Sequence, residues 1–159
     1  MRLRRDSLTP LALVAVLVAA PTARAEVSLA NAWMRPAYAG QPSAQVYVDV
    51  RSERPLKLVA ASAPVARRAE LVLVDPPSND PATHRAVAEL PVAGGGETRL
   101  ALGGSHVRLV EVSRDVWPGE RWPLELAFVD AEGKRVTATA EVLVRGLMAR
   151  RPEDASPKD

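Results

Sequence analysis

The stretch Ser43–Arg51, with the sequence SAQVYVDVR, decides the fold class of this 159-residue chain. Its apolar side chains fall on every second position, at Ala44, Val46, Val48 and Val50. Successive side chains of a β-strand point to opposite faces, so a period of two predicts a strand with one face buried. The chain is therefore expected to build its core between β-sheets.

Further segments extend this pattern along the chain. Apolar and polar residues alternate again over 122–128 and over 136–144, and weaker strand candidates are residues 27–35, 56–61, 69–75, 84–90, 98–102 and 106–112. Turn residues separate them, including Gly94-Gly95-Gly96, which is interpreted as a hairpin turn. One short helical turn is expected at Ala63–Arg68. About nine short strands at this spacing predict an all-β fold, an antiparallel β-sandwich or β-barrel.

The N-terminal 25 residues have the organisation of an export signal. Arg2, Arg4 and Arg5 precede the apolar run Leu11–Ala20, and Ala23-Arg24-Ala25 is a small-x-small cleavage site. The apolar run is too short for a membrane anchor, which needs about 20 residues. The sequence therefore predicts a signal peptide over residues 1–25, cleaved near Ala25, and a periplasmic or secreted protein without a stable membrane anchor.

Loss of the signal peptide changes the charge of the chain. The whole chain has 21 basic and 19 acidic residues, and the signal peptide contains four Arg and one Asp of these. After cleavage, 17 basic and 18 acidic residues remain, which is a formal charge of −1. No field of one sign remains to attract nucleic acid. The remaining chain is expected to form one domain over residues 26–146, and the polar residues 147–159, with two Pro, are expected to form a disordered tail.

The residue types present restrict the chemistry of the protein. Cysteine is absent, which excludes a disulfide, a thiolate metal site, a thiol nucleophile and a lipid-anchored cysteine. Only two His residues could act as a general base. Ser105 and His106 are neighbours on an expected strand, so they point to opposite faces and do not form a nucleophile–base pair. The sequence therefore predicts a protein that is not an enzyme.

Four segments in this order resemble a known family. They are Asn31-Ala32-Trp33-Met34-Arg35-Pro36, residues 58–66 (LVAASAPVA), Gly103-Gly104-Ser105-His106-Val107-Arg108-Leu109, and residues 118–128 (PGERWPLELAF). Together they make residues 27–144 similar to the periplasmic PCu(A)C copper chaperones. The resemblance implies a cupredoxin-like Greek-key β-barrel or sandwich. It also implies delivery of Cu(I) to a copper-acceptor protein in the assembly of the cytochrome oxidase copper centre.

The copper motif of that family is only partly present in this chain. The family uses a His, a Met ten residues further on, and after 21 intervening residues a His-x-Met. His106 matches the second His and His84 occupies the position of the first Met, whereas Arg108 replaces the last Met. The first His position falls on Val72 or Leu73, and neither side chain can bind a metal.

Two metal hypotheses follow from these residues. His84 and His106 are the candidate metal ligands, and two imidazoles fit Cu(II) or Zn(II) better than Cu(I), with Asp75, Asp80 or water completing the coordination. Arg108 is expected on the strand face of His106, where its charge would repel a cation by a few kcal/mol at about 4–6 Å and an effective dielectric near 20.

The alternative is a metal-free interaction module on the same barrel. It would bind a protein partner through an exposed Trp117 or the Pro-rich loop 36–42, whereas Trp122 alternates with leucines and is expected in the core.

Overall fold

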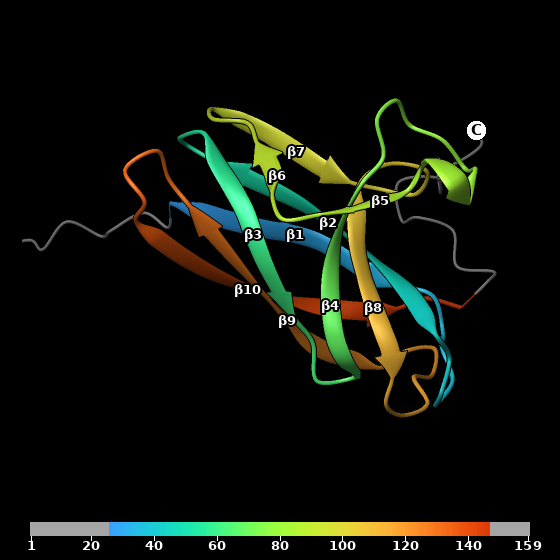
Figure 1. Cartoon of the computed structure of the whole chain (residues 1–159). Helices are drawn as coiled ribbons and strands as arrows, with labels where there is room; N and C mark the ends of the chain where they lie inside the picture. The colour runs from blue at the N-terminus through green and yellow to red at the C-terminus, as the bar shows by residue number, and fades with distance from the viewer. Residues whose placement is uncertain (1–25, 147–159) are drawn as a thin grey trace, which may run out of the picture.

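The computed structural model describes residues 26–146, and these form an all-β domain (Figure 1). The predicted signal peptide and the predicted tail 147–159 lie outside the described residues. The strands are β1 (Val27–Met34), β2 (Ser43–Ser52), β3 (Leu56–Ser62), β4 (Ala66–Leu73), β5 (Arg85–Val87), β6 (Leu90–Val92), β7 (Gly96–Leu100), β8 (His106–Val112), β9 (Arg121–Val129) and β10 (Arg135–Val144), with one 3₁₀-helix, η1 (Pro81–Thr83).

The strands form a single curved sheet that nearly closes on itself. Neighbouring strands follow the order β5-β4-β8-β2-β1-β10-β9-β3-β6, and β7 pairs with β2 off this path. All pairs are antiparallel except β1 with β10. β3 and β4, near the two ends of the path, also contact each other and run side by side in Figure 1. This confirms the predicted cupredoxin-like β-barrel.

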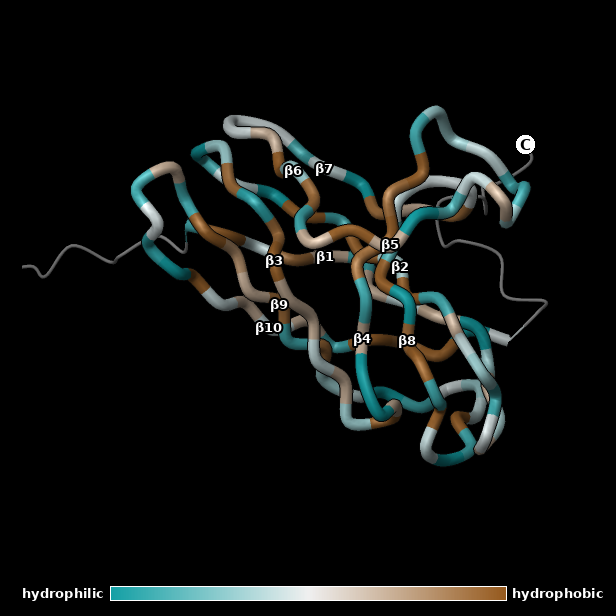
Figure 2. Tube along the Cα trace, in the orientation of Figure 1, coloured by the Kyte–Doolittle hydropathy of each residue, from teal (hydrophilic) through white to brown (hydrophobic). Residues whose placement is uncertain are grey.

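The core follows the period of two in the sequence. Ala44, Val46, Val48 and Val50 of β2 are all buried, as are Trp122, Leu124 and Leu126 of β9. Figure 2 shows the corresponding alternation of apolar and polar residues along the strands. The largest fully buried side chain is Phe128 of β9. Burial of these side chains from both walls of the barrel is the main stabilising contribution to the fold.

Three local expectations were wrong. Residues 63–68 form no helical turn, because β4 begins at Ala66 and pairs there with Val112 of β8. The candidate strand 84–90 is instead divided between β5 and β6, which pair with β4 and β3 respectively. Gly94-Gly95-Gly96 is not a hairpin turn, since β6 pairs with β3 and β7 pairs with β2. A Cβ atom on Gly94 would lie 2.5 Å from Pro55, so only glycine fits where the β6–β7 connection passes Pro55.

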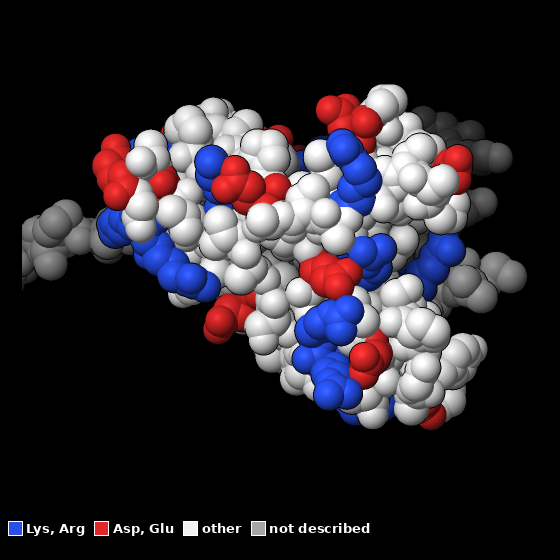
Figure 3. All heavy atoms as spheres, in the orientation of Figure 1, with Lys and Arg blue, Asp and Glu red and all other residues white. Residues whose placement is uncertain are grey.

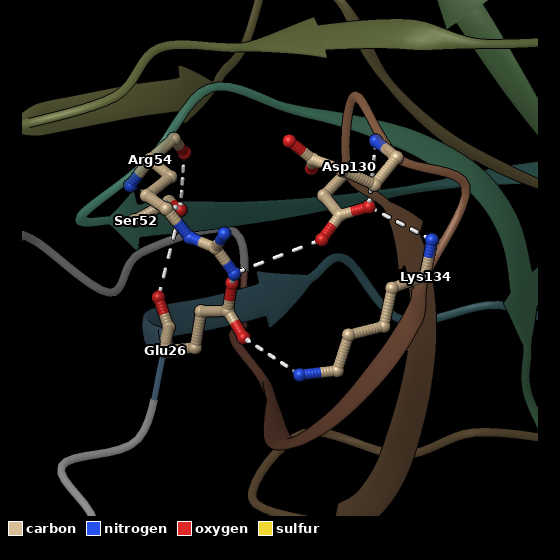
Figure 4. A network of polar contacts seen from close by, with 6 residues as sticks. Glu26, Ser52, Arg54, Asp130 and Lys134 are labelled. Atoms are coloured by element: carbon tan, nitrogen blue, oxygen red, sulfur yellow. Dashed lines mark hydrogen bonds and ion pairs between the residues drawn. The ribbon is translucent and has the colours of Figure 1, made fainter.

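An ion network closes the end of the barrel at which β1 begins (Figure 4). Glu26 contacts Arg54 of the β2–β3 turn, and Lys134 of the β9–β10 turn lies 4.0 Å from the other Glu26 oxygen. Asp130 is buried, accepts a hydrogen bond from the Lys134 backbone N–H at 2.8 Å, and lies 3.7 Å from Arg54. The Ser52 hydroxyl donates to the Arg54 carbonyl at 2.6 Å. The first described residue is thereby fixed to two turns of the barrel.

Candidate metal site

The site is built on the outer face of the sheet, where β4, β8 and β2 lie side by side. His106 opens β8 and lies opposite Val72 of β4. Val107 and Leu109 point into the core, so His106 and Arg108 point outward. His106 is nevertheless only 1% exposed. The ring is buried beneath the loop before β5, which carries His84.

That loop brings His84 to His106. Asp80 caps η1 by accepting a hydrogen bond from the Ala82 N–H at 2.9 Å, and the His84 N–H donates to the Pro81 carbonyl at 3.1 Å. This turn directs the partly buried His84 ring back over the sheet. The ring centroids of His84 and His106 lie 5.2 Å apart at an interplanar angle of 62°. The structure therefore brings together the two histidines that the sequence singled out.

Backbone carbonyls orient both rings. Nε2 of His84 lies 3.0 Å from the Ser78 carbonyl oxygen, and Nδ1 of His106 lies 2.9 Å from that of Gly104. A carbonyl oxygen can only accept, so each of these nitrogens carries the hydrogen. Nδ1 of His84 and Nε2 of His106 then keep their lone pairs for an ion. Such a hydrogen bond from the second nitrogen is the usual support of a metal-binding histidine.

The environment of His106 keeps its ring neutral. Burial lowers the pKa of His106 below its usual 6.5, and the neighbouring His84 and Arg108 lower it further. The hydrogen bond to Gly104 opposes this shift. Because the neutral imidazole is the form that binds metals, the lowered pKa favours coordination.

Two aromatic side chains, Tyr47 and Trp33, extend the pair of histidine rings across the outer face of the sheet. Tyr47 packs edge-on against His106 with ring centroids 6.2 Å apart, and Trp33 lies 4.7 Å from Tyr47. The guanidinium of Arg145 lies 5.0 Å above the Trp33 ring. Burial raises the pKa of Tyr47, whose hydroxyl donates to Gln45, so this phenol stays protonated and is not an ion ligand.

Arg108 differs from its expected role as an unpaired charge. Its Nε and Nη2 atoms contact one Glu70 oxygen at 3.1 and 2.8 Å, and Arg68 contacts the other Glu70 oxygen at 3.1 Å. These hydrogen bonds lower the pKa of Glu70, and the bond from Arg108 has the largest effect. Figure 3 shows basic and acidic side chains interleaved over the face that carries β4 and β8. The carboxylate of Glu70 offsets much of the repulsion that Arg108 alone would exert on a cation at His106.

The expected additional ligands do not join the histidines. Within residues 26–146, no group of three His, Cys, Asp or Glu side chains is placed to hold a metal ion. Asp80 uses its carboxylate to cap η1 instead. Met34 is fully buried in the core, and Met148 lies outside the described residues. The described residues thus offer two imidazole nitrogens and leave the remaining coordination positions open.

Sequence reasoning missed the residues that shape this site from neighbouring strands. Neither Glu70 nor Tyr47 belongs to a recognisable sequence motif. Strand register brings both of them to the site. Glu70 lies opposite Arg108, and Tyr47 follows Val46, which lies opposite Val107. The outward position of Tyr47 in the alternating stretch was the available signal, yet the side chain is only 3% exposed.

A family model matches residues 27–142, and its description reads "Putative lipoprotein LpqE-like". The chain belongs to the LpqE-like family. The 159 residues of this LpqE-like protein contain no cysteine. No curated protein matches the chain.

Solved PCuAC domains share the fold of this LpqE-like protein. The copper-bound PCuAC domain from PmoF2 superimposes with a TM-score of 0.58 at 21% identity, covering 76% of this chain and 93% of that domain. The Cu(I) form of DR1885 from Deinococcus radiodurans gives a TM-score of 0.57 at 21% identity, covering 83% of both chains. These similarities confirm the fold that the resemblance implied.

No helix among residues 26–146 has the length and apolar character needed to cross a membrane.

Proposed function

We propose that this protein is a periplasmic, copper-chaperone-like protein that binds an ion through Nδ1 of His84 and Nε2 of His106. The observation that carries the proposal is the paired arrangement of the two rings, 5.2 Å apart and each oriented by a carbonyl. This separation allows one nitrogen from each ring to reach a shared ion with bonds of about 2.0–2.1 Å. Export rests on the predicted signal peptide over residues 1–25.

The donor set favours Cu(II) or Zn(II) over Cu(I). Imidazole nitrogen suits Cu(II) and Zn(II), whereas the soft thioethers that favour Cu(I) are absent from the described surroundings of the two rings. Water would fill the open positions. A site with two protein ligands also releases its ion more readily than a closed four-ligand site, which suits delivery rather than storage.

The proposed recipient is a copper-acceptor protein that assembles the copper centre of cytochrome oxidase. This part of the proposal rests on the resemblance to the PCu(A)C chaperones and on the shared fold. The open coordination positions support it chemically, because an incoming ligand from an acceptor could bind the ion before either histidine leaves.

A second candidate function is a metal-free interaction module. Trp117 is 58% exposed and Tyr38 is 65% exposed. An isolated bridge between Ala37 and Val116 places the two aromatics on neighbouring turns. Exposed aromatic side chains are common at the centre of protein interfaces, which favours a partner at this end of the barrel.

One titration separates the two functions. The purified protein is titrated with Cu(II), with Zn(II) and, under reducing anaerobic conditions, with Cu(I), beside a His84→Ala/His106→Ala double variant. The proposal predicts a one-to-one complex with Cu(II) or Zn(II) that the double variant loses. Binding that survives in the double variant would assign the ion to another group, and no binding by the wild-type protein would favour the interaction module.

A further inference from the structure

A small hollow of about 280 Å³ opens beside Tyr47, on the outer face of the sheet. Its lining includes Arg35 at the end of β1, Ser43 and Gln45 of β2, and Leu102 of the loop that leads to His106. The lining contains one cation and no acidic residue. Tyr47 forms the wall that the hollow shares with the histidine site, because the same ring packs against His106.

Arg35 and Gln45 supply hydrogen-bond donors to the hollow. The Tyr47 hydroxyl donates a hydrogen bond to the side-chain oxygen of Gln45, so the Gln45 NH₂ group is left to donate to a ligand. The positive charge of Arg35 acts on the Tyr47 phenol, lowering its pKa against the effect of burial. Donors with a single positive charge fit a monoanion.

Arg35 also differs from most arginines of the barrel in its surroundings. Arg51, Arg54, Arg68 and Arg108 each form an ion pair with a glutamate. Among residues 26–146, no carboxylate lies within ion-pair distance of Arg35. Within these residues no carboxylate occupies the guanidinium, whose planar fork matches the two oxygens of a carboxylate ligand.

The remaining wall of the hollow is apolar and accessible. Leu102 is 55% exposed, which is unusual for a leucine in a barrel whose other leucines are mostly buried. An apolar group bound over Leu102 would remove this surface from water. The ligand that fits both walls carries a negative charge at one end and a short carbon skeleton at the other.

We propose that this hollow is a binding site for small organic carboxylates, with Arg35 and Gln45 holding the carboxylate and Leu102 contacting the carbon chain. The site goes beyond the proposed ion binding and does not require an ion. It is therefore tested on metal-free protein, where the state of the histidine site cannot change the result.

Propionate is the probe, and uncharged propionamide of the same shape is its control. Each is titrated into the ¹⁵N-labelled, metal-free protein while amide resonances are followed by NMR. Propionate is expected to shift the resonances of Gln45, Tyr47 and Leu102 in a saturable manner, whereas propionamide leaves them in place. Arg35→Gln is expected to weaken propionate binding about tenfold or more, since it removes a charge-assisted pair of hydrogen bonds.

Arg135→Gln is the matched control, because Arg135 is also an exposed arginine and lies at the start of β10, outside the lining of the hollow. It is expected to bind propionate as the wild type does. Equal weakening by both substitutions, equal shifts with propionamide, or tighter binding of sulfate than of propionate would overturn the proposal. A blocked Gly-Asp-Gly peptide that bound more tightly than propionate would assign the hollow to acidic protein side chains instead of small acids.

Discussion

Val72 lies directly opposite His106 in the β4–β8 pair, so the two side chains occupy the same face of the sheet. The resemblance to the copper chaperones left the first ligand position open between Val72 and Leu73. Strand register selects Val72, because the side chain of Leu73 points to the other face.

Val72→His is therefore expected to add a third imidazole to the site and to raise Cu(II) or Zn(II) affinity at least tenfold. Isothermal titration of the purified variant measures the change. The new polar side chain replaces a fully buried valine, so a loss of about 1–3 kcal/mol in the free energy of unfolding is expected without metal. Leu73→His is the control and should not raise the affinity. A gain in Leu73→His and none in Val72→His would contradict the proposed face of the site.

Glu70 is expected to support ion binding although it does not contact the ion. Glu70→Gln removes the negative charge that neutralises Arg108 and should weaken Cu(II) binding severalfold, because the guanidinium then acts unopposed on the ion. Glu97 forms similar ion pairs with Arg51 and Arg99 of β2 and β7. Glu97→Gln should leave the affinity unchanged, and an equal loss in both variants would indicate a general effect of charge.

Arg108→Met is expected to shift the preference of the site toward Cu(I). The substitution removes the cation beside His106 and introduces a thioether at the position where the resembled family has methionine. Competition titration with a Cu(I) chelator measures the affinity. Arg68→Met also removes a Glu70 partner but lies further along β4, and it should leave Cu(I) affinity near the wild-type value. An unchanged affinity in Arg108→Met would show that this position does not face the ion.

The pKa of His106 predicts a loss of stability in mild acid. Burial lowers that pKa in the folded protein below 6.5, so near pH 6 the unfolded chain binds more protons than the folded one. The contribution of the neutral, buried ring to the free energy of unfolding is complete above the unfolded pKa of 6.5 and is lost as the pH falls below 6.5 toward the lowered pKa of the folded state. Urea unfolding of the metal-free protein between pH 5 and 8 measures this slope.

His106→Asn is the comparison for that slope, since an asparagine amide can still donate to the Gly104 carbonyl. The variant should show a shallower fall in stability between pH 7 and 5 than the wild type. A steeper fall, or an identical one, would contradict the role of His106 burial.

The sequence predicted the strands better than the connections between them. Alternation over β2, β9 and β10 identified both the strands and their buried faces, because the period of two follows directly from strand geometry. The division of residues 84–90 between β5 and β6 could not be predicted in this way. Short strands carry too few residues for a period, and their pairing depends on partners far away in the chain.

The site was predicted in part for the same reason. His84 and His106 were identified from spacing, whereas the pairing of Arg108 with Glu70 and the packing of Tyr47 on His106 depend on which strands adjoin. The sequence predicted that Arg108 repels a cation, because it identified the strand that carries Arg108 but not the strand that pairs with it. Strand register supplies the missing carboxylate.

The central claim is that one ion binds to both His84 and His106, and pulsed electron paramagnetic resonance of the Cu(II) complex tests it most directly. The remote nitrogen of each coordinated imidazole modulates the electron spin echo, so the spectrum counts the histidines on the ion. Two imidazoles are expected in the wild type and one in each of His84→Ala and His106→Ala. A wild-type spectrum with one imidazole or none, or a spectrum that neither substitution changes, would contradict the claim.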